Sequence, residues 1–140
     1  MKKTILITFL IVAVAAGVFV WQNFMNTGPS MKRLDAVYRL NAIELYQEYD
    51  ENEDAATVKY GNRIVELVGE LESIEMNEGS NTVINLKTEG FGLVKCTLES
   101  DLSSDELNEL ELNSTLLIKG ECIGYLLDVL IERAIILDPS

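Results

Sequence analysis

The sequence contains no histidine, and it has only two cysteines and two prolines among its 140 residues. Without histidine the chain lacks the side chain that most often acts as a general base or as a metal ligand near neutral pH. No pairing of a nucleophile with a base, no phosphate-binding loop and no cluster of metal ligands can be recognised. We therefore predict that the protein is not an enzyme and that it needs no cofactor and no metal.

Basic residues are also scarce, with 11 lysines and arginines against 23 acidic residues and a net charge of -12. Two of the 11, Lys2 and Lys3, lie at the extreme N-terminus, so the rest of the chain has nine basic residues against the same 23 and a net charge of -14. A domain this acidic repels phosphate backbones and gains nothing from anionic lipid headgroups. Nucleic acid is therefore an unfavourable partner by charge.

Charge is absent altogether from the run between Thr4 and Phe24. As a helix with a rise of 1.5 Å per residue, this run is long enough to cross a bilayer, and Trp21 and Phe24 stand where interfacial aromatic residues belong. The small residues at 13–17 (AVAAG) leave a cleaved signal peptide open as an alternative. Because the apolar run continues past them, we favour an uncleaved anchor over residues 1–25. No nearby cysteine is present to accept a lipid.

The flanking charges predict how this anchor is oriented. Lys2, Lys3 and the free amino group favour a cytoplasmic N-terminus, and Lys32 and Arg33 on the other side weaken this preference without reversing it. We therefore predict a single-pass protein of a bacterial inner membrane, with its C-terminal domain in the periplasm or otherwise outside the cytoplasm.

The next part of the chain divides into a linker and a helical segment. Residues 26–40 contain a glycine–proline pair that cannot extend the anchor helix, and they predict a linker. Residues 41–61 predict two short helices, because Asn41 and Glu44 have the spacing of a capping box and Gly61 is a natural C-terminal cap.

From residue 62 to residue 138 the apolar pattern changes to a period of two, which predicts strands. The first strand, 62–76, is long, and its apolar phase slips near Glu72 and Ser73, as a bulge or sharp bend would produce. A capping box at Ser103 and Glu106 predicts a helix between the third and fourth strands. The remaining strands are predicted at 82–88, 93–100, 114–122 and 128–137, with a turn at Gly124 and Tyr125. The predicted core consists of Leu67, Leu71, Ile84, Leu86, Val94, Leu98, Leu107, Ile118 and Ile135.

Five strands with one helix between the third and the fourth are typical of the oligonucleotide/oligosaccharide-binding (OB) fold, a small closed barrel. The bend in the first strand supports this prediction, because one strand must belong to both halves of such a barrel. We therefore predict a mainly β protein: an OB-fold barrel preceded by a helical segment and a transmembrane helix.

The stretches "NAIELYQEYDENEDAATVKYGNRIVELVGELESI", "VKCTLES" and "IKGECIGYLLDVLIERAIIL" resemble the tRNA_anti-like (OB-fold) family of bacterial membrane or exported proteins. The resemblance covers residues 42–137, and its most specific part is "KGECIGYLLDV" after "VKC". The family name implies nucleic-acid binding by analogy of fold only. Members often carry a cysteine in the last strand, where this chain has Ala134, so a bridge at that position is absent.

Cys96 and Cys122 both fall on the apolar side of their strands. Two interpretations stay open: two small buried hydrophobic side chains, or a disulfide across one end of the barrel in an oxidising compartment. The disulfide requires Cα atoms within about 7 Å of each other.

The second and third strands form the face with which OB folds usually bind ligands. From this face and its margins we take Asn85, Lys87, Phe91, Lys95 and Tyr125 as candidate ligand-binding residues. Single-strand binders stack bases on aromatic side chains in a basic groove, and no aromatic residue alternates along these strands. An ordinary solvated sheet face therefore remains the alternative to a ligand groove.

Residues 50–54 (DENED) match the opening of a calcium-binding loop, but the rest of the motif fails. Ala55 stands where a turn glycine is needed, and Gly61 stands where a bidentate glutamate is needed. We interpret the run as a solvated acidic helix end.

These observations predict a membrane-tethered, non-catalytic OB-fold binding module of the bacterial envelope, with a protein, peptide or glycan as its partner. The alternative is an OB-fold protein that binds nucleic acid, as the resemblance implies. A basic stripe would be expected of the alternative, and Lys87 and Lys95 are the only lysines on the predicted face.

Overall fold

The computed structural model describes residues 1–25 and 29–137, with side chains left out at 22–25. Part of the predicted linker (26–28), the Phe24 side chain and residue 138 lie outside the described residues. The chain divides into two compact units, Met1–Ser30 and Met31–Ser140.

The first unit contains one helix, α1 (Lys2–Met25). Its segment Lys2–Trp21 is 20 residues long and apolar enough to cross a membrane by length and composition. Apolar residues surround the helix rather than forming one stripe, which is typical of a helix whose whole circumference faces an apolar environment.

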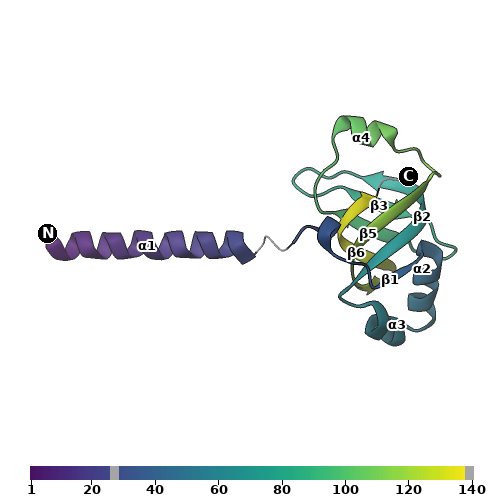
Figure 1. Ribbon diagram of the computed structural model, residues 1–140, viewed down its shortest axis with the longest axis horizontal. Helices are drawn as coiled ribbons and strands as arrows, with labels where there is room; N and C mark the ends of the chain where they lie inside the picture. The colour runs from purple at the N-terminus through teal and green to yellow at the C-terminus, as the bar shows by residue number, and fades with distance from the viewer. Residues whose placement is uncertain (26–28, 138–140) are drawn as a thin grey trace. The chain divides into compact units, whose positions relative to one another are not determined.

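In the second unit, the described residues 31–137 form a closed five-stranded barrel with one additional strand and three α-helices (Figure 1). The barrel strands are β2 (Arg63–Glu75), β3 (Val83–Leu86), β4 (Val94–Leu98), β5 (Thr115–Leu126) and β6 (Asp128–Leu137). They follow the order β2-β3-β4-β6-β5, and β5 pairs back with β2 to close the barrel. This is the topology of the OB fold, so the predicted fold class is confirmed.

The bend in β2 makes closure possible. The first part of β2 pairs with β5 from Arg63 to Glu70, and the last part pairs with β3 from Leu71 onward. The pairing register with β3 shifts between Leu71 and Ser73. This is the position at which the apolar phase slips in the sequence, and the predicted bend is confirmed.

Helices occupy both ends of the barrel (Figure 1). At one end lie α2 (Ala42–Glu51) and α3 (Glu53–Tyr60), and at the other lies α4 (Ser104–Glu109). Asn41 caps α2 by accepting a hydrogen bond from the Glu44 amide at 2.7 Å, and Ser103 and Glu106 form the complete capping box of α4. Both N-termini therefore lie where the sequence predicts them.

The segment that the sequence predicts to be a linker contributes to the barrel unit. It contains a short 3-10 helix (Met31–Arg33) and the additional strand β1 (Tyr38–Asn41), which runs parallel to β2. The Met31 side chain is fully buried, and the Lys119 ammonium donates a hydrogen bond to the Leu34 carbonyl at 2.8 Å. The sequence gives no sign of this strand, because a parallel strand is not joined to its partner by a hairpin turn. Its partner in β2 lies more than 20 residues further along the chain.

The predicted turn at Gly124 and Tyr125 is wrong. Strand β5 continues to Leu126, which pairs with Asp128, so Leu127 alone turns the chain. Gly124 instead lies at a register shift after Cys122 and has a φ of 150°. Glycine is common both in turns and at bulges, and here it allows the strand to bulge without ending.

Seven of the nine predicted core residues are buried, and Leu107 and Ile135 are not. Both are half-buried, and both lie at the α4 end of the barrel. None of the six residues of α4, all of them described, is buried. The helix therefore covers its end of the barrel only loosely, which leaves these two apolar side chains partly exposed.

Candidate ligand-binding surface

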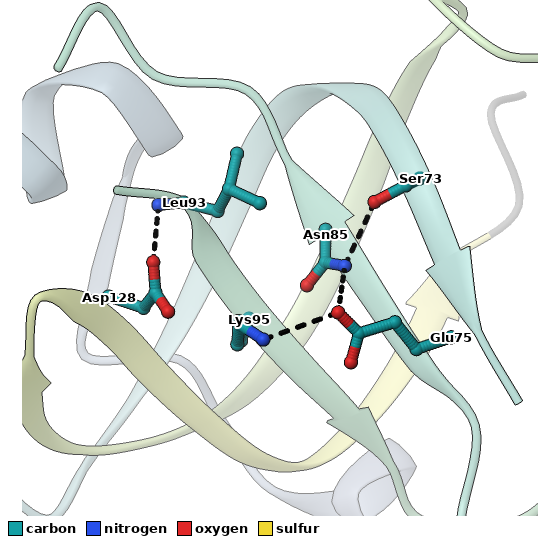
Figure 2. A network of polar contacts seen from close by, with 6 residues as sticks. All are labelled: Ser73, Glu75, Asn85, Leu93, Lys95 and Asp128. Atoms are coloured by element: carbon teal, nitrogen blue, oxygen red, sulfur yellow. Dashed lines mark hydrogen bonds and ion pairs between the residues drawn. The ribbon is translucent and has the colours of Figure 1, made fainter. Parts of the chain in front are cut away.

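The outer face of β3 and β4 carries a polar network centred on Asn85 (Figure 2). The Asn85 side-chain amide donates hydrogen bonds to Ser73 Oγ at 3.0 Å and to Glu75 Oε1 at 3.1 Å. Asn85 is 0% exposed, and its Oδ1 atom has no hydrogen-bond partner among the described residues. Asn85, a candidate ligand-binding residue, is therefore buried in this structure and not exposed on the face. Longer side chains from β2 and β4 meet at its position.

The two lysines of this face are both paired with carboxylates. Lys95 Nζ lies 3.3 Å from Glu75 Oε1 and Lys87 Nζ lies 3.6 Å from Glu70 Oε1. The hydrogen bonds from Asn85 and then Lys95 lower the pKa of Glu75, which keeps its carboxylate charged. Exposed ion pairs add little stability, but these two pairs cancel the positive charge that a phosphate would need.

Phe91 extends from the turn between β3 and β4 and is fully exposed. This turn lies beside the Leu127 turn. The Leu93 amide donates a hydrogen bond to Asp128 Oδ1 at 2.7 Å (Figure 2), and the Val129 amide donates one to the Leu93 carbonyl at 3.0 Å. A Cβ atom on Gly92 would clash with the Leu127 carbonyl oxygen, so only glycine allows this close approach.

Three exposed apolar side chains therefore lie at two adjacent turns, Phe91 and Leu127 within them and Leu126 at the last position of β5, and we call these three residues the turn patch. Leu126 is 77% exposed and Leu127 is 80% exposed. Leu127 also has a φ of 63°, in the left-handed region that costs a residue with a side chain about 1–2 kcal/mol. Because the leucine side chain is mostly exposed, its burial offsets little of this backbone strain. Strain of this kind is often found at functional sites.

Tyr125, which the sequence suggests as a ligand-binding residue at the rim, is held by other tyrosines. Its ring stacks on Tyr49 with the centroids 5.7 Å apart and meets the edge of Tyr46 at 6.0 Å. Its hydroxyl donates a hydrogen bond to Asp50 at 3.2 Å. Burial and the contacts with Tyr46 and Asp50 raise the pKa of Tyr125 to about 12. The ring packs α2 against the hairpin and is not free to stack on a ligand base.

The sequence pattern does not predict this aromatic cluster, which joins all five tyrosines of the chain. Tyr60 meets Tyr38 edge-on at 5.0 Å and contacts Tyr49 at 6.3 Å. The helical spacing of Tyr46 and Tyr49 indicates a buried stripe on α2. That spacing does not indicate that Tyr38 of β1 and Tyr125 of β5 complete the cluster.

Cys96 and Cys122 are buried free thiols in the structure, which corresponds to the first of the two interpretations that the sequence leaves open. Both residues pair with Ile131 of β6, Cys96 from β4 and Cys122 from β5. Their backbones are therefore two strand spacings apart, roughly 10 Å, and a disulfide tolerates about 7 Å between Cα atoms. Burial raises the pKa of both thiols, and the Tyr49 hydroxyl lies 3.3 Å from Cys122 Sγ.

The acidic run at 50–54 forms the junction between α2 and α3. Asn52 caps α3 by accepting a hydrogen bond from the Ala55 amide at 3.1 Å. Among the described residues, no group of three or more histidine, cysteine, aspartate or glutamate side chains is placed to hold a metal ion. The run agrees with the interpretation as a helix end.

The closed barrel, its bent first strand and its capping helix define an OB-fold protein with an apolar N-terminal helix. The tRNA_anti-like family model matches residues 1–136, so the chain belongs to the tRNA_anti-like family. A search of curated proteins gave no match.

One solved structure with the same fold comes from Klebsiella pneumoniae subsp. pneumoniae MGH 78578 and is described as a "putative nucleic acid-binding lipoprotein". The two chains share 13% sequence identity with a TM-score of 0.54, over 71% of this chain and 91% of the other. At this identity the likeness shows a shared fold and nothing about the ligand.

Proposed function

We propose that this protein is a membrane-tethered, non-catalytic binding module that holds a protein partner through the turn patch. The observation that carries the proposal is the exposure of Leu127 in a strained backbone conformation, beside Leu126 and Phe91. A soluble domain gains no stability from exposing three apolar side chains this close together. Exposed apolar groups of this kind often mark surfaces that other proteins cover.

The tether in this proposal is α1, with the N-terminus in the cytoplasm and the barrel on the other side of a bacterial inner membrane. Support comes from the length of the apolar segment Lys2–Trp21 and from the lysines that precede it. An exported barrel would meet envelope proteins far more often than cellular RNA or DNA, which agrees with a protein partner.

Nucleic-acid binding is the second candidate, and the fold neighbour described as a nucleic acid-binding lipoprotein favours it. Against it stand the pairing of Lys87 and Lys95 with glutamates and the packing of Tyr125 against α2. The usual face of the barrel therefore offers neither a free positive charge from these lysines nor this ring for stacking.

The decisive experiment compares the two candidates on the full chain, in membranes of the native host for cross-linking and in neutral detergent micelles for the titration that follows. A photo-reactive amino acid replaces Phe91 in one variant and Val58, which is exposed on α3, in the control. After irradiation in membranes of the native host, we expect one defined protein adduct from position 91 and none from position 58.

The same protein is then titrated against a fluorescent single-stranded DNA oligonucleotide at low salt. Micromolar affinity that falls as salt rises, and that is lost in Lys87→Glu/Lys95→Glu but kept in Arg39→Glu/Lys59→Glu, would overturn the proposal in favour of nucleic acid. Equal adducts from positions 91 and 58 would also contradict the turn patch as the contact surface.

A further inference from the structure

The α4 end of the barrel contains a cleft of about 640 Å³. Apolar side chains of the barrel line it, among them Leu98, Leu116, Ala134 and Ile136. Leu110, at the C-terminal end of α4, lines it as well and is half-buried. Clefts that bind small ligands or peptide side chains have volumes of about 300–1,000 Å³, so this one is large enough to receive several apolar groups.

The cleft exists because α4 covers this end of the barrel incompletely, and none of its six residues is buried. A smaller cavity of about 220 Å³ is lined by Leu107 of α4 and by Met76. Leu102 lines this cavity and the larger cleft, so open space lies on two sides of the segment that carries α4. The apolar stripe of this segment therefore has no complete partner within the described part of the chain.

The charge around the cleft has one sign. Glu106, Glu109 and Glu111 line it, and no lysine or arginine is among the described residues that line it. From Leu98 to Ile118 the sequence contains six acidic residues and no basic one. Hydrogen bonds from the Ser103 backbone amide and hydroxyl lower the pKa of Glu106, so its carboxylate stays ionised.

We propose that this cleft binds a cationic amphipathic segment of a partner protein. Apolar side chains of the segment would cover Leu110 and the barrel residues beneath it, and lysine or arginine side chains would meet Glu109 and Glu111. The inference rests on the proposed function in treating the barrel as a protein-binding module, but it uses the end of the barrel opposite to α2 and α3.

Charge complementarity decides between this occupant and an anionic amphiphile. A fatty acid or an anionic phospholipid would bring its head group close to three glutamates, in a domain that is already strongly acidic. Such contacts between like charges oppose binding, whereas basic side chains at the same rim speed association and favour the complex.

The test uses the full chain in neutral detergent micelles and a fluorescein-labelled peptide, LKKLLKKLLKKL, with fluorescence anisotropy as the readout. The peptide SKKSSKKSSKKS has the same charge without the apolar face, and LEELLEELLEEL has the apolar face with the opposite charge. Anisotropy with micelles alone supplies the baseline. We expect only the leucine–lysine peptide to bind to the protein.

Two variants, each with a matched control, distinguish a specific site at this cleft from nonspecific electrostatic attraction to the acidic domain. Glu109→Lys/Glu111→Lys should weaken binding about fivefold or more. Glu51→Lys/Glu53→Lys, with the same change in net charge at the other end of the barrel, should change it less than twofold. Leu110→Asp should also weaken binding although it adds negative charge, while Val58→Asp should not. Lysine at the C-terminal end of α4 interacts favourably with the helix dipole, so Glu109→Lys/Glu111→Lys should fold.

The inference would be overturned if Glu109→Lys/Glu111→Lys and its control lost equal affinity for the leucine–lysine peptide, or if the serine peptide bound equally well. Either result would mean that only the net charge of the domain attracts the peptide. Stronger binding of the glutamate peptide would assign the cleft to an anionic amphiphile. A wild-type dimer in sedimentation that Leu110→Asp dissociates would assign it to a second copy of the chain. In each case a specific adduct from position 91 would leave the proposed function standing.

Discussion

Leu127 is the residue at which stability and the proposed function oppose each other. Its left-handed backbone suits glycine, and its side chain is mostly exposed. Leu127→Gly should therefore raise the free energy of unfolding by about 1 kcal/mol, since it relieves a conformational cost of about 1–2 kcal/mol and adds some chain entropy to the unfolded state. Urea denaturation followed by circular dichroism measures this change.

The control is Leu126→Gly, one residue earlier, in a strand and without a positive φ. It should lower the free energy of unfolding by about 0.5–1 kcal/mol, as glycine does within a strand. If Leu127→Gly proves as destabilising as this control, the turn is not strained and the argument for a functional leucine fails.

Asn85 controls the titration of Glu75. The asparagine amide is the largest cause of the lowered pKa of Glu75, and Lys95 is the second. Asn85→Leu should therefore raise the pKa of Glu75, and Lys95→Met should raise it less. Carboxyl ¹³C chemical shifts followed from pH 2 to pH 7 report both values, with Asn108→Leu on α4 as the control.

The sign of the pH effect follows from the direction of this shift. A carboxyl group whose pKa falls on folding stabilises the protein above its unfolded pKa, here 4.5, and the contribution is lost as pH falls through the folded value. Asn85→Leu should thus show a smaller acid-linked loss of stability than the wild type. An unchanged pKa of Glu75 in this variant would contradict the hydrogen bond.

Cys96 and Cys122 should resist alkylation in the folded protein, because both are buried and burial raises the pKa of both thiols. In unreduced protein unfolded with guanidinium, both should react with iodoacetamide. Mass spectrometry should then show two modifications per chain. Failure to modify either cysteine without a reductant would mean that a bridge forms and that the strands approach more closely than their pairing with Ile131 indicates.

At the scale of elements, α2 shows how a local cap supports tertiary packing. Its buried residues Ala42, Leu45, Tyr46 and Tyr49 fall on one stripe, and they hold the helix against the barrel. Asn41→Ala removes the side chain that caps this helix. We expect the free energy of unfolding to fall by about 1 kcal/mol, the usual cost of losing an N-cap.

The control for this prediction is Asn108→Ala, the same substitution on an exposed position of α4. Alanine favours a helix interior more than asparagine does, so this variant should keep or slightly raise stability. Thermal unfolding of both variants gives the comparison. Equal effects of the two substitutions would mean that the Asn41 cap contributes nothing to the folded barrel.

At the scale of the whole molecule, the apolar helix and the acidic barrel predict a topology. A reporter that is active only in the cytoplasm, fused after Ser140 of the full chain, should be inactive, because the barrel would lie outside the cytoplasm. The same reporter fused to residues 31–140 alone should be active. Activity in both fusions would contradict the proposed location, and mass spectrometry of the mature N-terminus would separate an anchor from a cleaved signal peptide.

The sequence by itself determined the features that depend on near neighbours in the chain. The apolar run of α1, the caps at Asn41 and Ser103 and the alternation along the five barrel strands all follow from spacing within one segment. The phase slip near Ser73 also belongs to this group, because two successive apolar patterns on one strand reveal it. Together with the order of elements, these patterns were sufficient to predict the OB fold.

Only the tertiary structure decided which of these residues are exposed and which are covered. Asn85 and Tyr125 both look available in the sequence, yet side chains from β2 and β4 surround the first and tyrosines of α2 hold the second. Leu107 and Ile135 look buried, yet α4 leaves them half-exposed. The physical reason is that burial depends on contacts between segments far apart in the chain, and a local pattern contains no information about where those segments meet.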